Sequence, residues 1–218
     1  MATTTKAILK KVGEVKASSK AKKINFVQSI DLAINLKDVD LKKPENRIND
    51  ELVLSKGRGK KLKVAVIASG EMALQAKDVA DRVITKEELE ELAKDKKAAK
   101  KIANEIDFFI AQSDLMATVG RFLGPILGPR GKIPKPLPVG APIAPLADRL
   151  RKTVRLRSKD KPVVHLSVGT EDMSDEDIAE NVETVLSHIE RRLDKGLNNI
   201  KSVYIKTTMG PSIRLEVK

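Results

Sequence analysis

The segment that begins at Leu62 restricts the possible folds of this chain more than any other. It reads LKVAVIA, a short continuous apolar run that is typical of parallel strands covered on both faces. A helical stretch at 71–79 follows, then a short strand RVIT, a charged helix that reaches Asn104, a strand DFFIA and a helix DLMATVGRFL. Thr85 and Glu88 have the spacing of a capping box at the start of the charged helix. Three consecutive strand–helix units predict a small open α/β domain with a parallel sheet.

The two ends of the chain carry a different pattern, in which apolar and polar residues alternate as in half-buried strands. The stretch NFVQSIDLAINL alternates in this way, after a helical stretch at 5–18. Toward the other end, the predicted strands are TVRLR, PVVHLSV, SVYIKTTM and SIRLEV. Ser174 and Asp177 have the spacing of a helix start, which predicts a helix between the second and third of these strands. Only Gly210 and Pro211 separate the last two strands, which predicts a hairpin.

These patterns predict an α/β protein of two domains. The first domain is discontinuous, comprises residues 1–61 and 149–218 and contains an antiparallel sheet; the second, residues 62–148, is inserted into it. Residues 38–61 are rich in charge and are expected to form a polar connection, and APLADRL a short turn. Two chain crossings join the domains and form a natural hinge.

The composition favours a polyanionic partner. Lys and Arg number 42 against 30 Asp and Glu, so the net charge is +12 and the pI is about 9.7. Cysteine is absent, which excludes disulfides and a cysteine nucleophile, and no apolar run is long enough to span a membrane. The start of the chain lacks the apolar core of a secretion signal, so we expect a cytoplasmic protein with no membrane partner. Aromatic residues make up only 2% of the chain, so contacts to nucleic acid should depend on backbone and shape more than on stacking.

The stretch GRFLGPILGPRGKIPKPLPVG, residues 120–140, combines glycine, proline and basic residues and contains no acid. A phosphate-binding loop that ends at Gly131 and Lys132 would need glycine at 126 and a hydroxyl at 133, but both positions are isoleucine. The segment IASGEMAL likewise has one glycine where a dinucleotide site needs three. These mismatches disfavour a nucleotide-dependent enzyme and leave two interpretations of the stretch, a basic binding loop or a spacer between domains.

Other polar residues allow several interpretations. His188 is expected on a helix surface and His165 on an alternating strand, where it could face a ligand, and neither has the spacing of a metal site. The acidic run EDMSDED is explained by the dipole of the helix that it begins. KTTMGPS, from Lys206, is either a simple turn or a cluster of hydroxyls and open backbone groups that can reach ribose 2′-hydroxyls. No metal and no cofactor is expected.

Taken together, GRFLGPILGPRGKIPKPLP, KTTMGPSIRLEV and NFVQSIDLAI, in this order and spacing, closely resemble the ribosomal protein L-one family in its archaeal form. LSKGRGKK and VGTEDMSDEDIAEN extend the resemblance over essentially the whole chain, although Ser55 stands where relatives have proline. The resemblance implies a split α/β domain and an inserted Rossmann-like, three-layer domain. It also implies binding to the mobile stalk of large-subunit rRNA, help in releasing deacylated tRNA at the exit site, repression of the protein's own mRNA, and contacts with other large-subunit components.

The resemblance also implies two sets of RNA-binding residues. The main set lies in the first domain and consists of Lys23, Phe26, Gln28, Ser29, His165, Gly169, Lys206, Thr207, Thr208, Met209, Gly210 and Pro211. The second and weaker set lies in the inserted domain and consists of Arg121, Gly128, Arg130, Gly131 and Lys132. We therefore predict a ribosome-associated RNA-binding protein and not an enzyme. A nonspecific nucleic-acid-binding protein and a nucleotide-dependent enzyme remain the alternatives.

Overall fold

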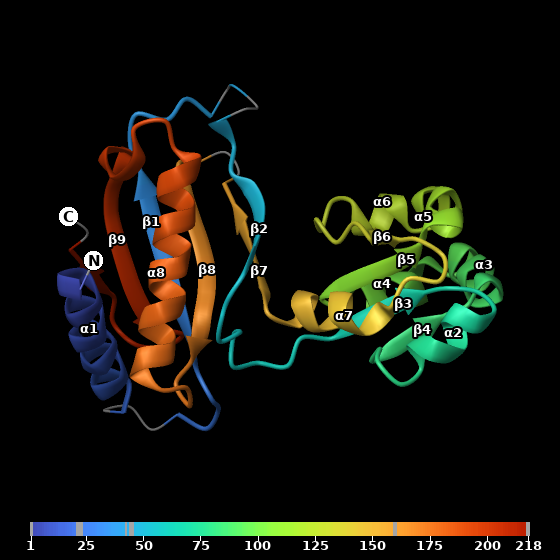
Figure 1. The fold of residues 1–218 in the computed structure, drawn as a ribbon, viewed down its shortest axis with the longest axis horizontal. Helices are drawn as coiled ribbons and strands as arrows, with labels where there is room; N and C mark the ends of the chain where they lie inside the picture. Colours follow the sequence, from blue (N-terminus) through green and yellow to red (C-terminus); the bar gives the residue numbers. More distant parts are fainter. Residues whose placement is uncertain (1, 21–23, 42, 44–45, 159–160, 217–218) are drawn as a thin grey trace. The chain divides into compact units, whose positions relative to one another are not determined.

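The computed structural model describes residues 2–20, 24–41, 43, 46–158 and 161–216 (Figure 1). The chain divides into two compact units, which we call unit 1 (residues 1–60 and 152–218) and unit 2 (residues 61–151). Unit 2 extends three residues beyond the predicted end because a helix, α7, continues to Arg151. The mixed α/β class is confirmed, with antiparallel strand pairing in unit 1 and a parallel sheet in unit 2.

Unit 1 is built on a four-stranded sheet in which every neighbouring pair is antiparallel. Its spatial order is β10-β9-β1-β8, with the bounds β1 Ser29–Leu36, β8 Val163–Thr170, β9 Ile200–Thr207 and β10 Ile213–Leu215. Two helices, α1 (Ala2–Lys20) and α8 (Asp175–Arg192), pack on one face of this sheet (Figure 1). The short 3-10 helix η3 (Gly196–Asn199) leads from α8 into β9.

The alternation in β1 decides which face of the sheet is buried. Ile30, Leu32, Ile34 and Leu36 point into the core beneath the two helices, whereas the residues between them are half-buried on the opposite face. The strand begins at Ser29 and not at Phe26, because pairing with β8 and β9 begins there. The face opposite the helices, which we call the open face, therefore carries polar side chains such as Asp31 and Asn35.

A second, two-stranded sheet of unit 1 corrects the sequence prediction. β2 (Asn49–Val53) pairs antiparallel with β7 (Thr153–Arg157), and lies inside the stretch that was expected to be only a polar connection. The sequence of β2 is NDELV, which has too few apolar residues to show an alternating pattern. Backbone pairing with β7 holds it in an extended conformation.

Unit 2 has three layers, with a parallel sheet in the middle. The strand order is β4-β3-β5-β6, with the bounds β3 Val64–Ile67, β4 Arg82–Ile84, β5 Phe108–Gln112 and β6 Lys135–Leu137. Side chains that alternate along β3 and β5 enter two separate cores, one on each face. One core lies under α3 (Lys86–Lys94), α4 (Lys96–Glu105), α5 (Met116–Phe122) and α6 (Gly124–Leu127), and the other under α2 (Glu71–Ala76) and α7 (Ile143–Arg151).

Three further predictions within unit 2 were wrong. The charged helix is two helices, because Asp95 leaves the helical conformation and accepts hydrogen bonds from the first N–H groups of α4. APLADRL is helical and forms most of α7. The stretch 120–140 is not a loop throughout, since it contains α6 and β6. Among the described helices, none is long and apolar enough to cross a membrane.

Candidate nucleic-acid interface

Three chain segments that are far apart in the sequence meet at one end of the unit 1 sheet. The antiparallel order brings the start of β1 beside the ends of β8 and β9, at the lower end of the sheet in Figure 1. Ser29 lies opposite Thr170 of β8, and Ile30 lies opposite Thr207 of β9. We call this end of the sheet the strand-end surface.

Thr208 and Ser29 hold β9 and β1 together just where the regular pairing stops. The backbone N–H of Thr208 donates to the Ser29 carbonyl at 3.1 Å, and the backbone N–H of Ser29 donates to the Thr208 hydroxyl at 3.2 Å. The same hydroxyl lies 3.3 Å from the Ser29 carbonyl oxygen and is exposed at the surface. This arrangement places a short hydroxyl and two backbone groups at the exposed edge.

The buried side chain of Gln28 holds the turn at residues 207–210 in place. Its side chain is only 2% exposed, and its Oε1 accepts a hydrogen bond from the backbone N–H of Met209 at 2.9 Å. Its Nε2 donates to the Ser19 hydroxyl and, at 3.3 Å, to Glu171. Both ends of this amide are therefore engaged inside the protein, where they hold the turn.

Glu171 in turn fixes the segment that carries Gln28. Its carboxylate accepts a hydrogen bond from the backbone N–H of Gln28 at 2.9 Å, and its own backbone N–H donates to the Gln28 carbonyl at 3.0 Å. Two hydrogen bonds thereby join the residue before β1 to the residue after β8, one between backbone groups and one from a backbone N–H to a side-chain carboxylate. Glu171 was not among the predicted site residues, because no local feature of the sequence distinguishes it from the other acids of the EDMSDED run.

The turn at 207–210 presents its apolar residue outward. The Thr207 side chain is fully buried, and its hydroxyl accepts a hydrogen bond from the backbone N–H of Gly210 at 3.1 Å. A Cβ atom at Gly210 would overlap that hydroxyl, so a larger residue there would displace the Thr207 side chain from its hydrogen bond. Met209 is 57% exposed and Phe26, on the neighbouring segment, is 53% exposed. Two large apolar side chains thus flank the polar edge.

The remaining residues of the predicted main set occupy different environments. Lys23 lies outside the described residues. Pro211 is exposed beside the turn, Lys206 is half-buried on the open face, and His165 is exposed there, opposite Ala33. Gly169 is buried, with Met173 and Ile178 within 3.2 Å of where a Cβ atom would lie. The structure therefore brings most of the described residues of this set to one end of the sheet and places His165 and Lys206 on the open face, but Thr207 and Gly169 are buried.

Asp31 lies on the open face among basic side chains. Burial raises the pKa of this carboxyl above its ordinary value, against the opposing effects of Lys206, Arg58 and His165. The residues directly opposite Asp31 are Lys206 on β9 and Ser167 on β8. A half-buried acid surrounded by cations leaves this face with a positive excess.

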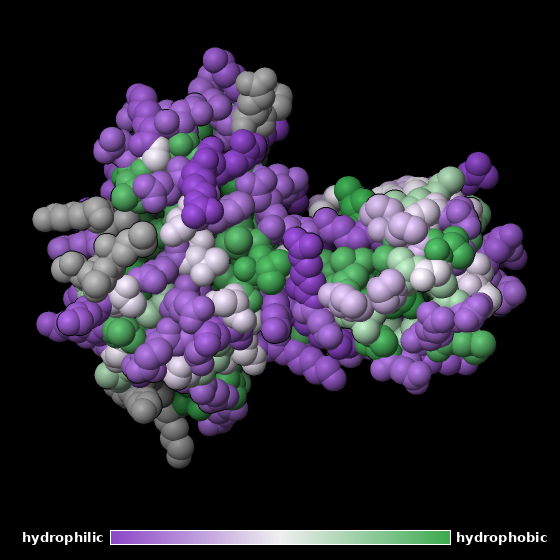
Figure 2. Space-filling model, viewed as in Figure 1, coloured by the Kyte–Doolittle hydropathy of each residue, from purple (hydrophilic) through white to green (hydrophobic). Residues whose placement is uncertain are grey.

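An acidic groove separates this surface from α1. It encloses about 670 Å³, and its lining includes Glu171, Asp172 and Asp175, with Lys16 paired to Asp175 at 2.6 Å. Phosphate groups would be repelled there. The helix-bearing side of unit 1 is also largely hydrophilic, with apolar side chains scattered between the polar ones (Figure 2).

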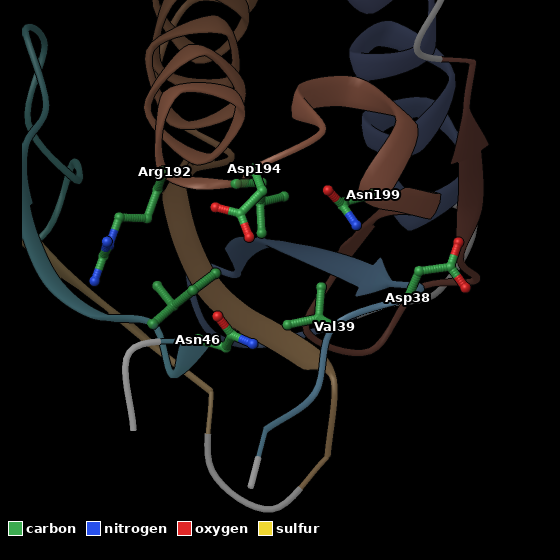
Figure 3. Close-up of a pocket in the computed structure, with 8 residues that line it drawn as sticks. Asp38, Val39, Asn46, Arg192, Asp194 and Asn199 are labelled. Carbon is green, nitrogen blue, oxygen red and sulfur yellow. The ribbon is translucent and has the colours of Figure 1, made fainter. Parts of the chain in front are cut away.

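A smaller cavity of about 200 Å³ lies at the opposite end of the unit 1 sheet (Figure 3). Its polar lining serves the fold. Asn199 donates to the Lys37 carbonyl at 3.0 Å and accepts from the Lys195 backbone at 2.9 Å, and Arg192 lies 3.4 Å from Asp50. In the described part of the chain, no three His, Asp or Glu side chains gather closely enough to hold a metal ion.

The residues of the second predicted set are engaged within unit 2. Lys132 Nζ donates to the carbonyls of Ala103 and Ile106, at 2.9 and 2.5 Å, and so neutralises the C-terminal end of α4. Arg130 donates to Asn104 at 3.1 Å and to the Ile126 carbonyl at 2.9 Å.

The glycines of this second set have a backbone role. Gly131 has a φ of 68°, and a Cβ at Gly128 would lie 2.9 Å from the Gly124 carbonyl, so the turn after α6 needs both. Arg121 is exposed in the last turn of α5. Of the three cations in the set, Arg121 and Arg130 are well exposed and Lys132 is half-buried.

Comparison with known proteins gives consistent matches over nearly the whole chain. The model of the ribosomal protein L1p/L10e family matches residues 15–211. The large ribosomal subunit protein uL1 of Methanobrevibacter smithii is 56% identical over 212 residues, which are 97% of this chain and 99% of that protein. The uL1 proteins of Methanothermobacter thermautotrophicus and Pyrococcus horikoshii are 57% and 52% identical, over 92% and 99% of this chain and 97% and 98% of their own lengths.

Proposed function

The chain belongs to the ribosomal protein L1p/L10e family, and on that premise we propose that the strand-end surface of unit 1 binds folded RNA of the large ribosomal subunit. This chain is a ribosomal protein of the large subunit and is associated with ribosomes in the cytoplasm. Its relatives are named as ribosomal proteins and not as enzymes. The observation that supports the proposed surface is the junction of Ser29 and Thr208, where hydroxyl and backbone groups meet at an exposed edge.

The chemistry of this edge suits RNA. A shallow RNA minor groove displays 2′-hydroxyls, which hydroxyl and backbone groups on short side chains and turns can reach. The net charge of +12 supplies attraction to phosphates that does not depend on sequence. Phe26 and Met209 provide apolar area beside the polar groups, where a sugar or base can pack. Recognition would therefore rest on shape and sugar contacts, with salt-sensitive affinity from lysine and arginine.

The finer assignment follows from the family motifs. The RNA would be the mobile stalk of large-subunit rRNA near the tRNA exit site, and the protein would assist the release of deacylated tRNA there. The same surface would bind a similar structure in the protein's own mRNA and repress its translation. Other large-subunit components would be neighbours in the assembly.

A competition experiment tests this proposal. Labelled stalk RNA is titrated with the full chain in a gel-shift assay, and unlabelled stalk RNA or duplex DNA is added as competitor. We expect the stalk RNA to displace the label at far lower concentration than the DNA, and the chain to sediment with large subunits and wash off at high salt. Equal competition by both nucleic acids would instead favour nonspecific binding.

A deletion tests the assignment to unit 1. The core of unit 1 comes entirely from residues 1–60 and 152–218, and the Leu54 N–H donates to the Lys152 carbonyl at 2.9 Å, so the two segments already lie together. Replacing residues 61–151 with a short Gly/Ser linker should leave most of the affinity for stalk RNA. A remnant that folds but does not bind would show that the main surface lies elsewhere.

A further inference from the structure

The loop Lys56–Lys60, which follows β2, is fixed to the unit 1 sheet by a buried asparagine. Asn181 of α8 is fully buried, and its Nδ2 donates to the carbonyls of Gly57 and Val168, at 2.8 and 2.9 Å. Its Oδ1 accepts from the backbone N–H of Lys56 at 3.4 Å. One side chain thus ties this loop to β8. We call residues 56–60 the docked loop.

The glycines of the docked loop permit its close approach. Gly57 and Gly59 have φ values of 68° and 69°, which disfavour other residues. A Cβ atom on Gly59 would overlap the Thr170 hydroxyl and would lie 2.7 Å from the sulfur of Met173. The loop therefore packs directly against the end of β8, and the motif KGRGKK has a conformational reason for both glycines.

This position makes the docked loop the next element in the strand-end surface. Thr170, which it contacts, lies opposite Ser29, and Ser29 bonds Thr208. The row from β9 through β1 to β8 spans about 10 Å, two strand spacings. The loop prolongs that row beyond β8.

The side chains of the docked loop differ in their engagement. Lys56 lies 3.6 Å from both Asp177 and Glu180 and is held by those acids. Arg58 is half-buried and lies near enough to Asp31 to influence it, together with Lys206 and His165, so its charge adds to that of the open face. Lys60 is exposed and forms no ion pair with the residues that the structure describes.

We propose that the docked loop is a further RNA-binding element, in which Arg58 and Lys60 contact backbone phosphates beside the RNA segment held at Ser29 and Thr208. The inference rests on the proposed function. Arginine offers a planar fork that can bind phosphate oxygens in a bidentate manner, and lysine a point charge. Contacts of this kind position the RNA without reading its sequence. Lys56 serves the attachment to α8.

The salt dependence of binding tests the proposal. Affinity of the full chain for the stalk RNA is measured at several salt concentrations for the wild type and for the double variant Arg58→Gln, Lys60→Gln. The slope of log affinity against log salt should become shallower by about 1.4 to 1.8, the loss of two phosphate contacts. The matched control is Lys10→Gln, Lys201→Gln, which removes two exposed charges away from this surface and should keep the wild-type slope.

Two further measurements distinguish a failure of the docked-loop proposal from a failure of the proposed RNA-binding function. Lys60→Gln alone changes only an exposed side chain and should reduce the slope by about 0.7 to 0.9 even if the double variant folds poorly. Wild-type slopes for both docked-loop variants, alongside weakened binding by Thr208→Val, would overturn the role of the loop and leave the strand-end surface in place. A wild-type chain that shows no preference for stalk RNA would overturn the proposed function itself.

Discussion

The side-chain oxygen of Gln28 accepts a hydrogen bond from the backbone N–H of Met209 at 2.9 Å, across 181 positions of sequence. This bond sets the turn that presents Met209 at the strand-end surface. Gln28→Met keeps the volume of the side chain but leaves that N–H without its partner, which should weaken RNA binding and folding by about 1 to 3 kcal/mol. Gel-shift titration and urea denaturation measure the two effects.

The matched control for this change is Gln75→Met, because the Gln75 side chain lies exposed on α2, where it bonds Glu71 of the same helix. It should change neither quantity by more than a few tenths of a kcal/mol. If Gln28→Met behaved like this control, the turn would not depend on the buried amide.

Thr208→Val removes the hydroxyl that bonds Ser29 at the exposed edge. We expect the affinity for stalk RNA to fall by about 1 to 3 kcal/mol, since the Ser29 N–H loses its acceptor and the RNA loses a polar partner. A filter-binding titration measures this loss. Thr184→Val is the control, because that hydroxyl bonds only the Glu180 carbonyl within α8. Unchanged affinity in Thr208→Val would remove this residue from the interface.

The raised pKa of Asp31 predicts a pH-dependent cost to folding. Above the ordinary value of 3.8, the folded state retains a proton that the unfolded state releases, so this group's contribution to stability falls as the pH rises through the folded pKa. Asp31→Asn should therefore be more stable than the wild type at pH 7, and the difference should vanish below pH 3.8.

Denaturant unfolding at pH 3 and pH 7 checks this expectation, with the exposed Asp172→Asn as control. Lower stability of Asp31→Asn at pH 7 would show that Lys206, Arg58 and His165 stabilise the ionised carboxylate by more than its burial costs.

Lys132→Met separates a structural role of this side chain from a role in binding RNA. Its ammonium group caps the end of α4, so the change should destabilise the protein by about 1 to 2 kcal/mol. Affinity for stalk RNA should stay near the wild-type value where both proteins are folded. Thermal unfolding and a binding titration give the two quantities, and Lys100→Met, at an exposed site of α4 outside both predicted sets, is the control. Lost affinity without lost stability would restore Lys132 as an RNA contact.

Local sequence patterns were sufficient for much of the fold. The alternation around Ile30 and Leu32 identified the buried face of β1, and continuous apolar runs identified β3 and β5. Thr85 and Ser174 cap their helices as the sequence indicated, although the Glu88 side chain bonds Arg82 instead of returning to Thr85. These features depend on residues within a few positions of one another, so a short window contains their cause.

The proposed interface depends on contacts that no short window contains. Ser29 and Thr208 are 179 positions apart, Gln28 and Glu171 are 143 apart, and Asn181 and Gly57 are 124 apart. The family motifs predict the main set of RNA-binding residues, but they do not distinguish the buried Gln28 and Thr207 from the exposed Phe26 and Met209. Likewise, β2 is a strand because β7 pairs with it, and not because of its own residues. Periodicity determines which face of a strand is apolar, whereas strand order and long-range hydrogen bonds decide which polar groups meet at its end.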